Sequence, residues 1–92
     1  MRLSEVREIL IERGKTHGSF TTYSSISSRL QLAMGVDELD KYDEVEKQAI
    51  LMILSKLARI ANGDTTHKDH WLDIGGYSQL VVDHLENGEL KS

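Results

Sequence analysis

One stretch of twenty residues, DEVEKQAILMILSKLARIAN from Asp43 to Asn62, constrains the fold more than any other part of the chain. At 100° per residue, its apolar side chains cover an arc of about 200° around a helix. A helix with so wide an apolar surface must be central to a helical assembly. Asp43 and Glu46 are spaced as a capping box, which predicts where this helix begins.

The rest of the chain also predicts helices. It has no proline, and no stretch alternates polar and apolar residues as a strand would. Glycines fall at plausible helix ends. We predict helices at residues 4–13, 21–34, 43–62 and 67–86. The predicted fold is one all-α domain over residues 1–92, a compact bundle of four helices in which the short turn before the last helix makes the third and fourth antiparallel.

Composition excludes several classes of function. The formal net charge is −4, so electrostatic attraction to nucleic acid or anionic membranes is weak, and DNA binding by the first two helices is disfavoured. Without cysteine the chain forms neither disulfides nor thiolate zinc sites. Charged residues interrupt the N-terminal segment, so we do not expect a signal peptide there. The sequence contains no run of about 18 apolar residues that would be long enough to span a membrane. We expect a cytoplasmic protein whose thin core favours a homo-oligomer.

The fourth predicted helix contains the stretch THKDHWLDIGGYSQLVVDHL, which holds three of the four histidines and the only tryptophan. In it, Thr66 and Asp69 are spaced as a second capping box. Helical spacing predicts an inward face made of Trp71, Ile74, Ser78, Val81, Val82 and Leu85. A line of polar side chains borders that face: His70, Asp73, Tyr77 and His84. Gly75 and Gly76 each cost about 1 kcal/mol inside a helix. They indicate close helix packing, within the bundle or across a dimer, or room for a flat ligand.

Two basic residues are the first candidates for binding. Lys56 and Arg59 lie one turn apart and would form a fork that holds a phosphate, Arg59 with two parallel donors. Alternatively both extend to solvent from the end of the helix, where cations suit its dipole. Asp73 would pair with Arg59, or orient His70 as a general base.

Metal binding and the first loop give weaker signals. His67, Asp69, His70 and Asp73 cluster within seven residues, but they do not share one helix face, so we expect no metal. If a metal did bind, Asp69, His70 and Asp73 would be its ligands. In the loop RGKTHGSF, two glycines flank a short segment that includes His17, and Arg13 precedes it. Such a loop would cradle phosphate with its backbone N–H groups, or serve only as a turn.

Three motifs, ERGKTHGSF, LSKLARIANG and HKDHWLDIGGY, together resemble a family of small phage and prophage proteins of unknown function. The resemblance covers about Glu12 to Leu85. It implies a role for these residues: Arg13, Gly14, Gly18, Phe20, Lys56, Arg59, Lys68, Asp69, Trp71, Asp73, Gly76 and Tyr77. The sequence departs from the pattern at His17, where tyrosine is usual, and at Ser19, where an acidic residue is common.

That family is in turn similar, more remotely, to nucleotide-modification-associated phage domains and to all-α nucleoside triphosphate pyrophosphohydrolases of the MazG type. The latter enzymes hold magnesium with two acidic pairs on neighbouring helices. Here Asp73 remains, but His70 stands where a glutamate would be, and the second half of the preceding helix has no acidic pair. Loss of these carboxylates removes the metal cage. The resemblance therefore implies binding of a nucleotide more than its hydrolysis.

Our functional expectation is recognition of a nucleotide or nucleotide-like phosphate between the third and fourth helices. Lys56 and Arg59 would contact the phosphate, Asp73 would orient Arg59, and Trp71 or Tyr77 would stack on a base. One alternative is a pyrophosphohydrolase-like enzyme that uses Mg²⁺ or Mn²⁺ at Asp73. Another is a module that binds a protein of the bacterial host.

Overall fold

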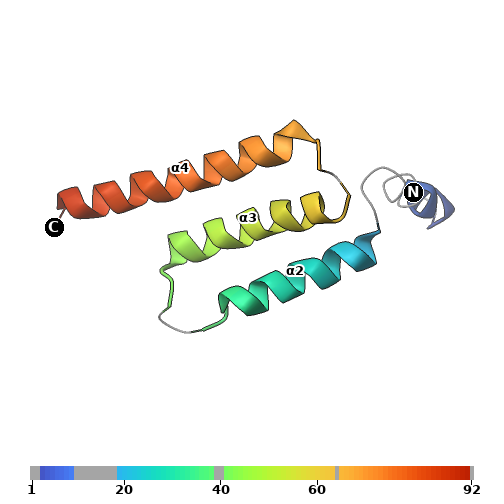
Figure 1. Cartoon of the computed structure of the whole chain (residues 1–92), viewed down its shortest axis with the longest axis horizontal. Coiled ribbons are helices and arrows are strands. Elements are labelled where there is room, and N and C mark those ends of the chain that lie inside the picture. The colour runs from blue at the N-terminus through green and yellow to red at the C-terminus, as the bar shows by residue number, and fades with distance from the viewer. Residues whose placement is uncertain (1–2, 10–18, 39–40, 64, 92) are drawn as a thin grey trace.

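The computed structural model describes residues 3–9, 19–38, 41–63 and 65–91, which form four helices (Figure 1). Residues 3–9 are helical, and the other three helices, labelled as in the figure, are α2 (Phe20–Met34), α3 (Glu44–Ala61) and α4 (Lys68–Lys91). The predicted all-α class with four helices is confirmed. The end predicted for the first helix lies outside the described residues, and α4 continues beyond the predicted end at Glu86.

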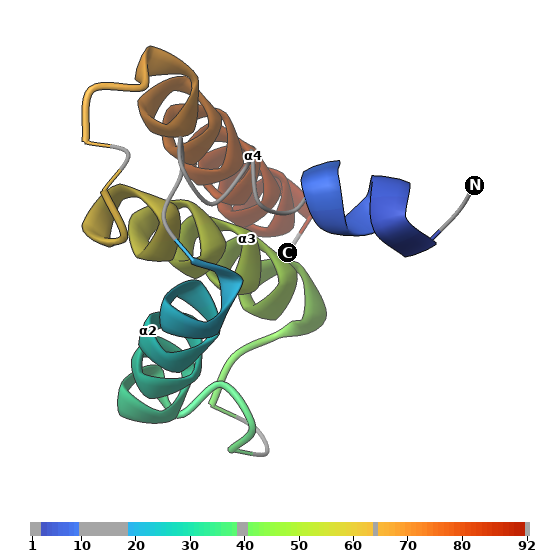
Figure 2. The same cartoon turned by 90° about the vertical axis from the view of Figure 1, so that its right-hand side faces the viewer.

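Helix α3 is central, as its wide apolar arc predicted. It packs against both α2 and α4, and Figures 1 and 2 show it lying between them. Two contacts fix α3 and α4 as antiparallel neighbours. Lys56, late in α3, pairs with Asp73, early in α4, and Asp43, which caps the start of α3, lies 3.0 Å from His84 near the end of α4.

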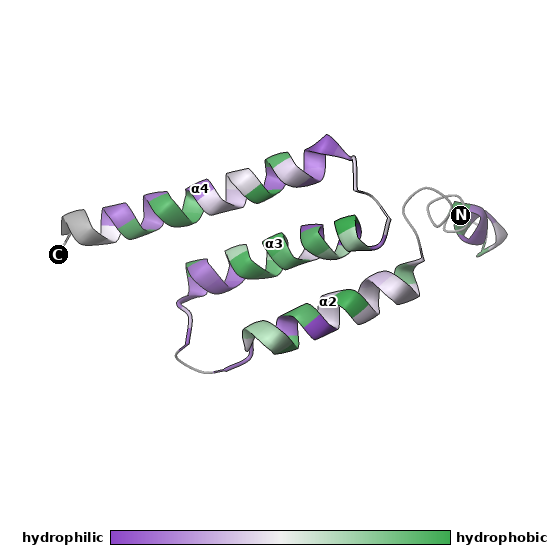
Figure 3. Ribbon diagram, viewed as in Figure 1, coloured by the Kyte–Doolittle hydropathy of each residue, from purple (hydrophilic) through white to green (hydrophobic). Residues whose placement is uncertain are grey.

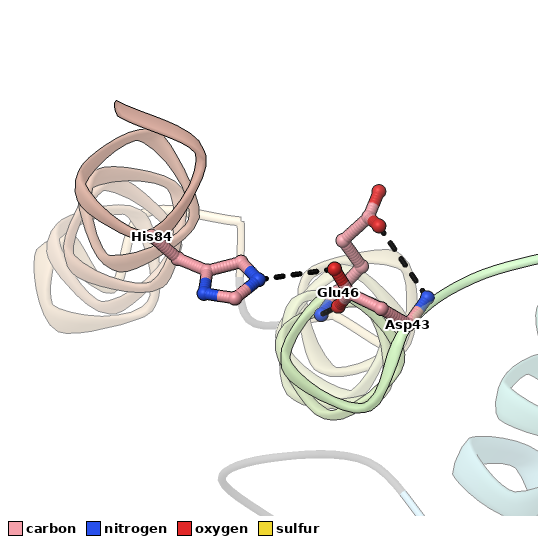
Figure 4. Close-up of polar contacts among 3 residues, drawn as sticks. All are labelled: Asp43, Glu46 and His84. Atoms are coloured by element: carbon pink, nitrogen blue, oxygen red, sulfur yellow. Dashed lines mark hydrogen bonds and ion pairs between the residues drawn. The ribbon is translucent and has the colours of Figure 1, made fainter. Parts of the chain in front are cut away.

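The predicted capping box of α3 is present (Figure 4). The backbone N–H of Glu46 donates to Asp43 Oδ1 at 2.7 Å, and the N–H of Asp43 donates to Glu46 Oε1 at 3.4 Å. The other carboxylate oxygen of Asp43 faces His84 Nε2 across the gap to α4. One side chain therefore both starts α3 and ties it to the far end of its neighbour.

The capping box predicted for α4 is wrong. The helix begins one residue later than predicted, so Thr66 falls outside the capping position. No hydrogen bond joins Thr66 to Asp69 in the described chain. The Asp69 carboxylate instead lies 3.7 Å from His67 Nε2, and the backbone N–H of His70 donates to the carbonyl of His67 at 3.1 Å. Asp69 still suits the first turn of the helix, where a negative charge opposes the helix dipole.

The predicted compactness is wrong, because the molecule is elongated. It measures 55 × 27 × 27 Å with a radius of gyration of 16.4 Å, against about 12 Å for a compact domain of this length. Its surface is 7139 Å², whereas a compact monomer of 10.4 kDa exposes about 5400 Å². The buried apolar residues in the described chain are few: Val36, Ala49, Leu54 and Ala58. A row of helices buries less than a closed bundle because each outer helix has one neighbour.

The rotation of α4 also differs from the prediction. The residues that are buried or half-buried along it are His70, Ile74, Tyr77, Val81 and His84. Trp71, Val82 and Leu85, predicted to face inward, are instead 53%, 45% and 49% exposed. The ion pair at Asp73 and the contact at His84 both bring the polar border of the helix onto α3. Polar contacts, which apolar periodicity does not register, have therefore set the rotation.

Among the described helices, none is both long and apolar enough to cross a membrane. The hydropathy of the ribbon shows why (Figure 3): polar segments interrupt the apolar ones along every helix.

Candidate functional site

The two candidate cations, Lys56 and Arg59, lie one turn apart on the central helix, and each is held by a different neighbour. Lys56 Nζ lies 3.0 Å from Asp73 Oδ2 on α4, where the lysine side chain is 20% exposed and the aspartate side chain 47%. The guanidinium of Arg59 lies over the ring of Tyr23 on α2, 4.7 Å from its centroid. The ion pair with Asp73 therefore forms with Lys56, and the predicted pairing with Arg59 is wrong.

The reason is the position of each residue around α3. Lys56 lies on the side that packs against α4, whereas Arg59, three residues later, is displaced toward α2 by about 60°. The hydroxyls of Tyr23 and Ser55 are 2.8 Å apart in a partly buried hydrogen bond. That bond fixes the ring beneath the guanidinium. The site therefore draws on α2 as well as on α3 and α4.

Arg59 combines exposure with a fixed position. Its side chain is exposed, and in the described part of the chain it forms no ion pair with a carboxylate. A guanidinium that lies over an aromatic ring keeps N–H groups available for a further partner. Those donors fit the paired oxygens of a phosphate or carboxylate. A second positive charge, on Lys56, lies one turn away on the same helix.

The aromatic residues predicted to stack on a base are divided by α4. Tyr77 is half-buried and lies one turn from Asp73, so it is on the same side of the helix. Trp71 precedes Asp73 by two residues, which places it about 160° away around the helix, on the opposite side. A ligand at Lys56 and Arg59 would therefore meet Tyr77 or Tyr23 rather than Trp71.

The remaining candidates do not converge on this site. His70 is buried, with 8% of its surface exposed, and its ring lies 4.8 Å from that of His67. The described residues contain no group of three or more histidine, aspartate or glutamate side chains placed to hold one metal ion. Arg13 and His17 lie outside the described residues.

Gly75 and Gly76 have room around them. A Cβ atom built on either glycine meets nothing within 4 Å. Close packing against another helix of the same chain, one of the reasons considered for these glycines, is therefore not what the described structure uses them for.

The sequence did not predict two contacts of α3. The position of Tyr23 under Arg59 depends on where α2 lies, which the sequence alone does not give. The contact of Asp43 with His84 could have been predicted from the sequence, because an antiparallel α4 must bring its end to the start of α3.

The hydrogen bond from the Glu46 N–H and the contact with His84 both lower the pKa of the Asp43 carboxyl below its ordinary value of 3.8.

Fold and site together define a small all-α domain with two cations held on its central helix. The model of a family described as a domain of unknown function, DUF6378, matches residues 2–84, and the chain belongs to this family. No curated protein and no solved structure matches the chain.

Proposed function

We propose that the protein recognises a nucleotide or nucleotide-like phosphate at the surface of α3 that carries Lys56 and Arg59. The proposal rests on the position and the exposure of the Arg59 side chain. Its guanidinium is exposed and stacked 4.7 Å from the Tyr23 centroid. It has no carboxylate partner in the described chain, so its edge is available for an anionic ligand.

The residues at this surface would each contribute a different interaction with the ligand. Arg59 donates two parallel hydrogen bonds to phosphate oxygens, and Lys56 adds a second positive charge. Asp73 holds the lysine side chain at 3.0 Å and limits how strongly the site attracts anions. Tyr77 supplies a ring for a base. The ligand therefore has a phosphate end on α3 and a planar end at an aromatic ring.

The resemblance to phage proteins supports a nucleotide as the ligand, and it suggests two uses for the binding. The protein would serve nucleotide metabolism during infection, or it would sequester a signalling nucleotide of the host. The Mg²⁺- or Mn²⁺-dependent enzyme stays an alternative that a turnover assay separates from binding.

Isothermal titration calorimetry tests the proposal directly. Pyrophosphate and a panel of nucleoside mono-, di- and triphosphates are titrated into the wild type, into Arg59→Gln, and into Arg29→Gln as a matched control. Arg29 is an exposed arginine on α2 that bonds to Ser25 at 2.7 Å. Because charged hydrogen bonds contribute about 1.5–3 kcal/mol, Arg59→Gln should weaken binding by about tenfold or more.

The control should bind like the wild type. Absence of binding across the panel would overturn the proposal, and so would equal weakening by the two substitutions.

A further inference from the structure

One face of α4 is apolar and uncovered. Trp71, Gly75, Ser78, Val82 and Leu85, called here the α4 stripe, follow one another at alternating spacings of four and three residues. That spacing places them on a single face of the helix, as in a coiled coil. Trp71, Val82 and Leu85 are 53%, 45% and 49% exposed. The face turned to α3 carries other residues, so the stripe has no partner in the described chain.

The glycine next to the centre of the stripe adds an independent observation. Gly75 lies inside the helix, where it costs about 1 kcal/mol relative to alanine. A Cβ atom there would meet nothing within 4 Å, so the chain's own packing does not require glycine. Small residues in the middle of a stripe allow another helix to approach closely, while the large residues at both ends pack beside it.

The exposed area matches the need of a stable interface. The surface of 7139 Å² exceeds that of a compact monomer of this mass by about 1700 Å². A standard interface buries about 800 Å² on each partner, and obligate dimers bury more. The excess belongs to the whole elongated molecule and is larger than the area that one standard interface buries on each partner.

The stripe is also complementary to itself. Trp71 and Leu85 lie seven residues on either side of Ser78. In an antiparallel pair of α4 helices, a two-fold axis near Ser78 brings Trp71 of one protomer against the partner's Leu85, Gly75 against the partner's Val82, and the two Ser78 residues against each other. A two-fold interface requires such self-complementarity.

The charges at the edge of the stripe favour the same arrangement. Lys68 and Glu86 are eighteen residues apart, which is five helical turns, so both lie on one edge. Neither forms an ion pair within the described chain. In an antiparallel pair, equivalent edges face each other, so Lys68 meets the partner's Glu86 at both ends of the interface.

We propose that the protein forms an antiparallel two-fold dimer through the α4 stripe. This dimer leaves the side of α4 that carries Asp73 open, because Asp73 and Trp71 lie on opposite sides of the helix. The proposal therefore does not depend on the proposed function, and each can fail without the other.

Sedimentation velocity of the full chain over a range of concentrations tests the dimer. The wild type should sediment with twice the chain mass of 10.4 kDa. Val82→Glu should raise the dissociation constant at least tenfold. Leu80→Glu is the matched control, because Leu80 is 59% exposed on the same helix but outside the stripe. It should leave the dimer intact.

Two further comparisons remove ambiguity about folding and orientation. Gly75→Leu should dissociate the dimer and Gly76→Leu should not, although both place a good helix former in open space. Lys68→Glu should weaken the dimer, and adding Glu86→Lys should restore it. Circular dichroism confirms that each variant is helical.

A monomeric wild type at about 100 μM would overturn the proposal, since that concentration far exceeds the dissociation constant of a standard interface. An oligomer that resists both Val82→Glu and Gly75→Leu would also overturn it. Failure of the Lys68 and Glu86 exchange to restore association would refute the antiparallel orientation.

Discussion

Replacing Asp73 with asparagine separates the binding proposal from the enzyme alternative. The Asp73 carboxylate lies 3.0 Å from Lys56 Nζ, so a phosphate oxygen on the other side of that ammonium would lie about 6 Å from the carboxylate, two contacts of about 3 Å in line. At this separation two unit negative charges repel by about 0.7 kcal/mol in water and by more near the protein surface. Asp73→Asn removes this repulsion. Binding of pyrophosphate should therefore become about threefold to tenfold tighter at low salt.

The fold should tolerate the change. Asp73 is half exposed, and an ion pair of that kind contributes at most about 1 kcal/mol. Calorimetry with pyrophosphate measures the affinity, and Asp83→Asn serves as the control because Asp83 is an exposed aspartate on the same helix, bonded to Gln79 at 2.9 Å. Weaker binding of pyrophosphate by Asp73→Asn than by this control would refute repulsion by the Asp73 carboxylate. Release of pyrophosphate from a nucleoside triphosphate with Mg²⁺ or Mn²⁺, lost in Asp73→Asn, would establish the enzyme instead.

Three other predictions concern stability. Leu54 is 6% exposed on the central helix, so Leu54→Ala should lower the free energy of unfolding by about 2–5 kcal/mol in urea denaturation. A loss of less than about 1 kcal/mol would mean that Leu54 is not part of a packed core around α3. Gly76→Ala should raise it by about 1 kcal/mol, and the thermal midpoint by roughly 4–8 °C, because the new Cβ meets open space; a lower midpoint would show that the glycine is required. The lowered pKa of Asp43 means that its stabilising effect is present above its ordinary pKa of 3.8 and is lost as the pH falls through the folded value. Stability below pH 3.8 should therefore fall less steeply in Asp43→Asn than in the wild type, and parallel curves would contradict this cause.

The parts of the fold that the sequence predicted are those set by local rules. The apolar arc of residues 43–62 gave a central helix, and DEVE gave its capping box. The short turn before α4 gave antiparallel neighbours. These features depend on spacing within one element or on the length of one connection.

What the sequence did not predict depends on how the helices meet. The apolar residues of α4 indicated an inward face, but contacts of Asp73 and His84 with α3 turned the helix so that Trp71 is exposed. Asp73 was likewise predicted to pair with Arg59, but it pairs with Lys56. Arg59 instead lies over Tyr23 on α2. Spacing along one helix does not determine which of two nearby cations reaches a given carboxylate.

A titration followed by nuclear magnetic resonance tests most directly whether Arg59 and Lys56 bind phosphate. Pyrophosphate is added to ¹⁵N-labelled protein while backbone amides and arginine side-chain Nε–H signals are recorded. If phosphate binds at this site, saturable shifts are expected at Arg59 Nε–H and at the amides of Ser55, Lys56 and Arg59, with the Arg29 Nε–H signal unchanged. No saturable shift, or shifts elsewhere that leave Arg59 unaffected, would contradict phosphate binding at this site.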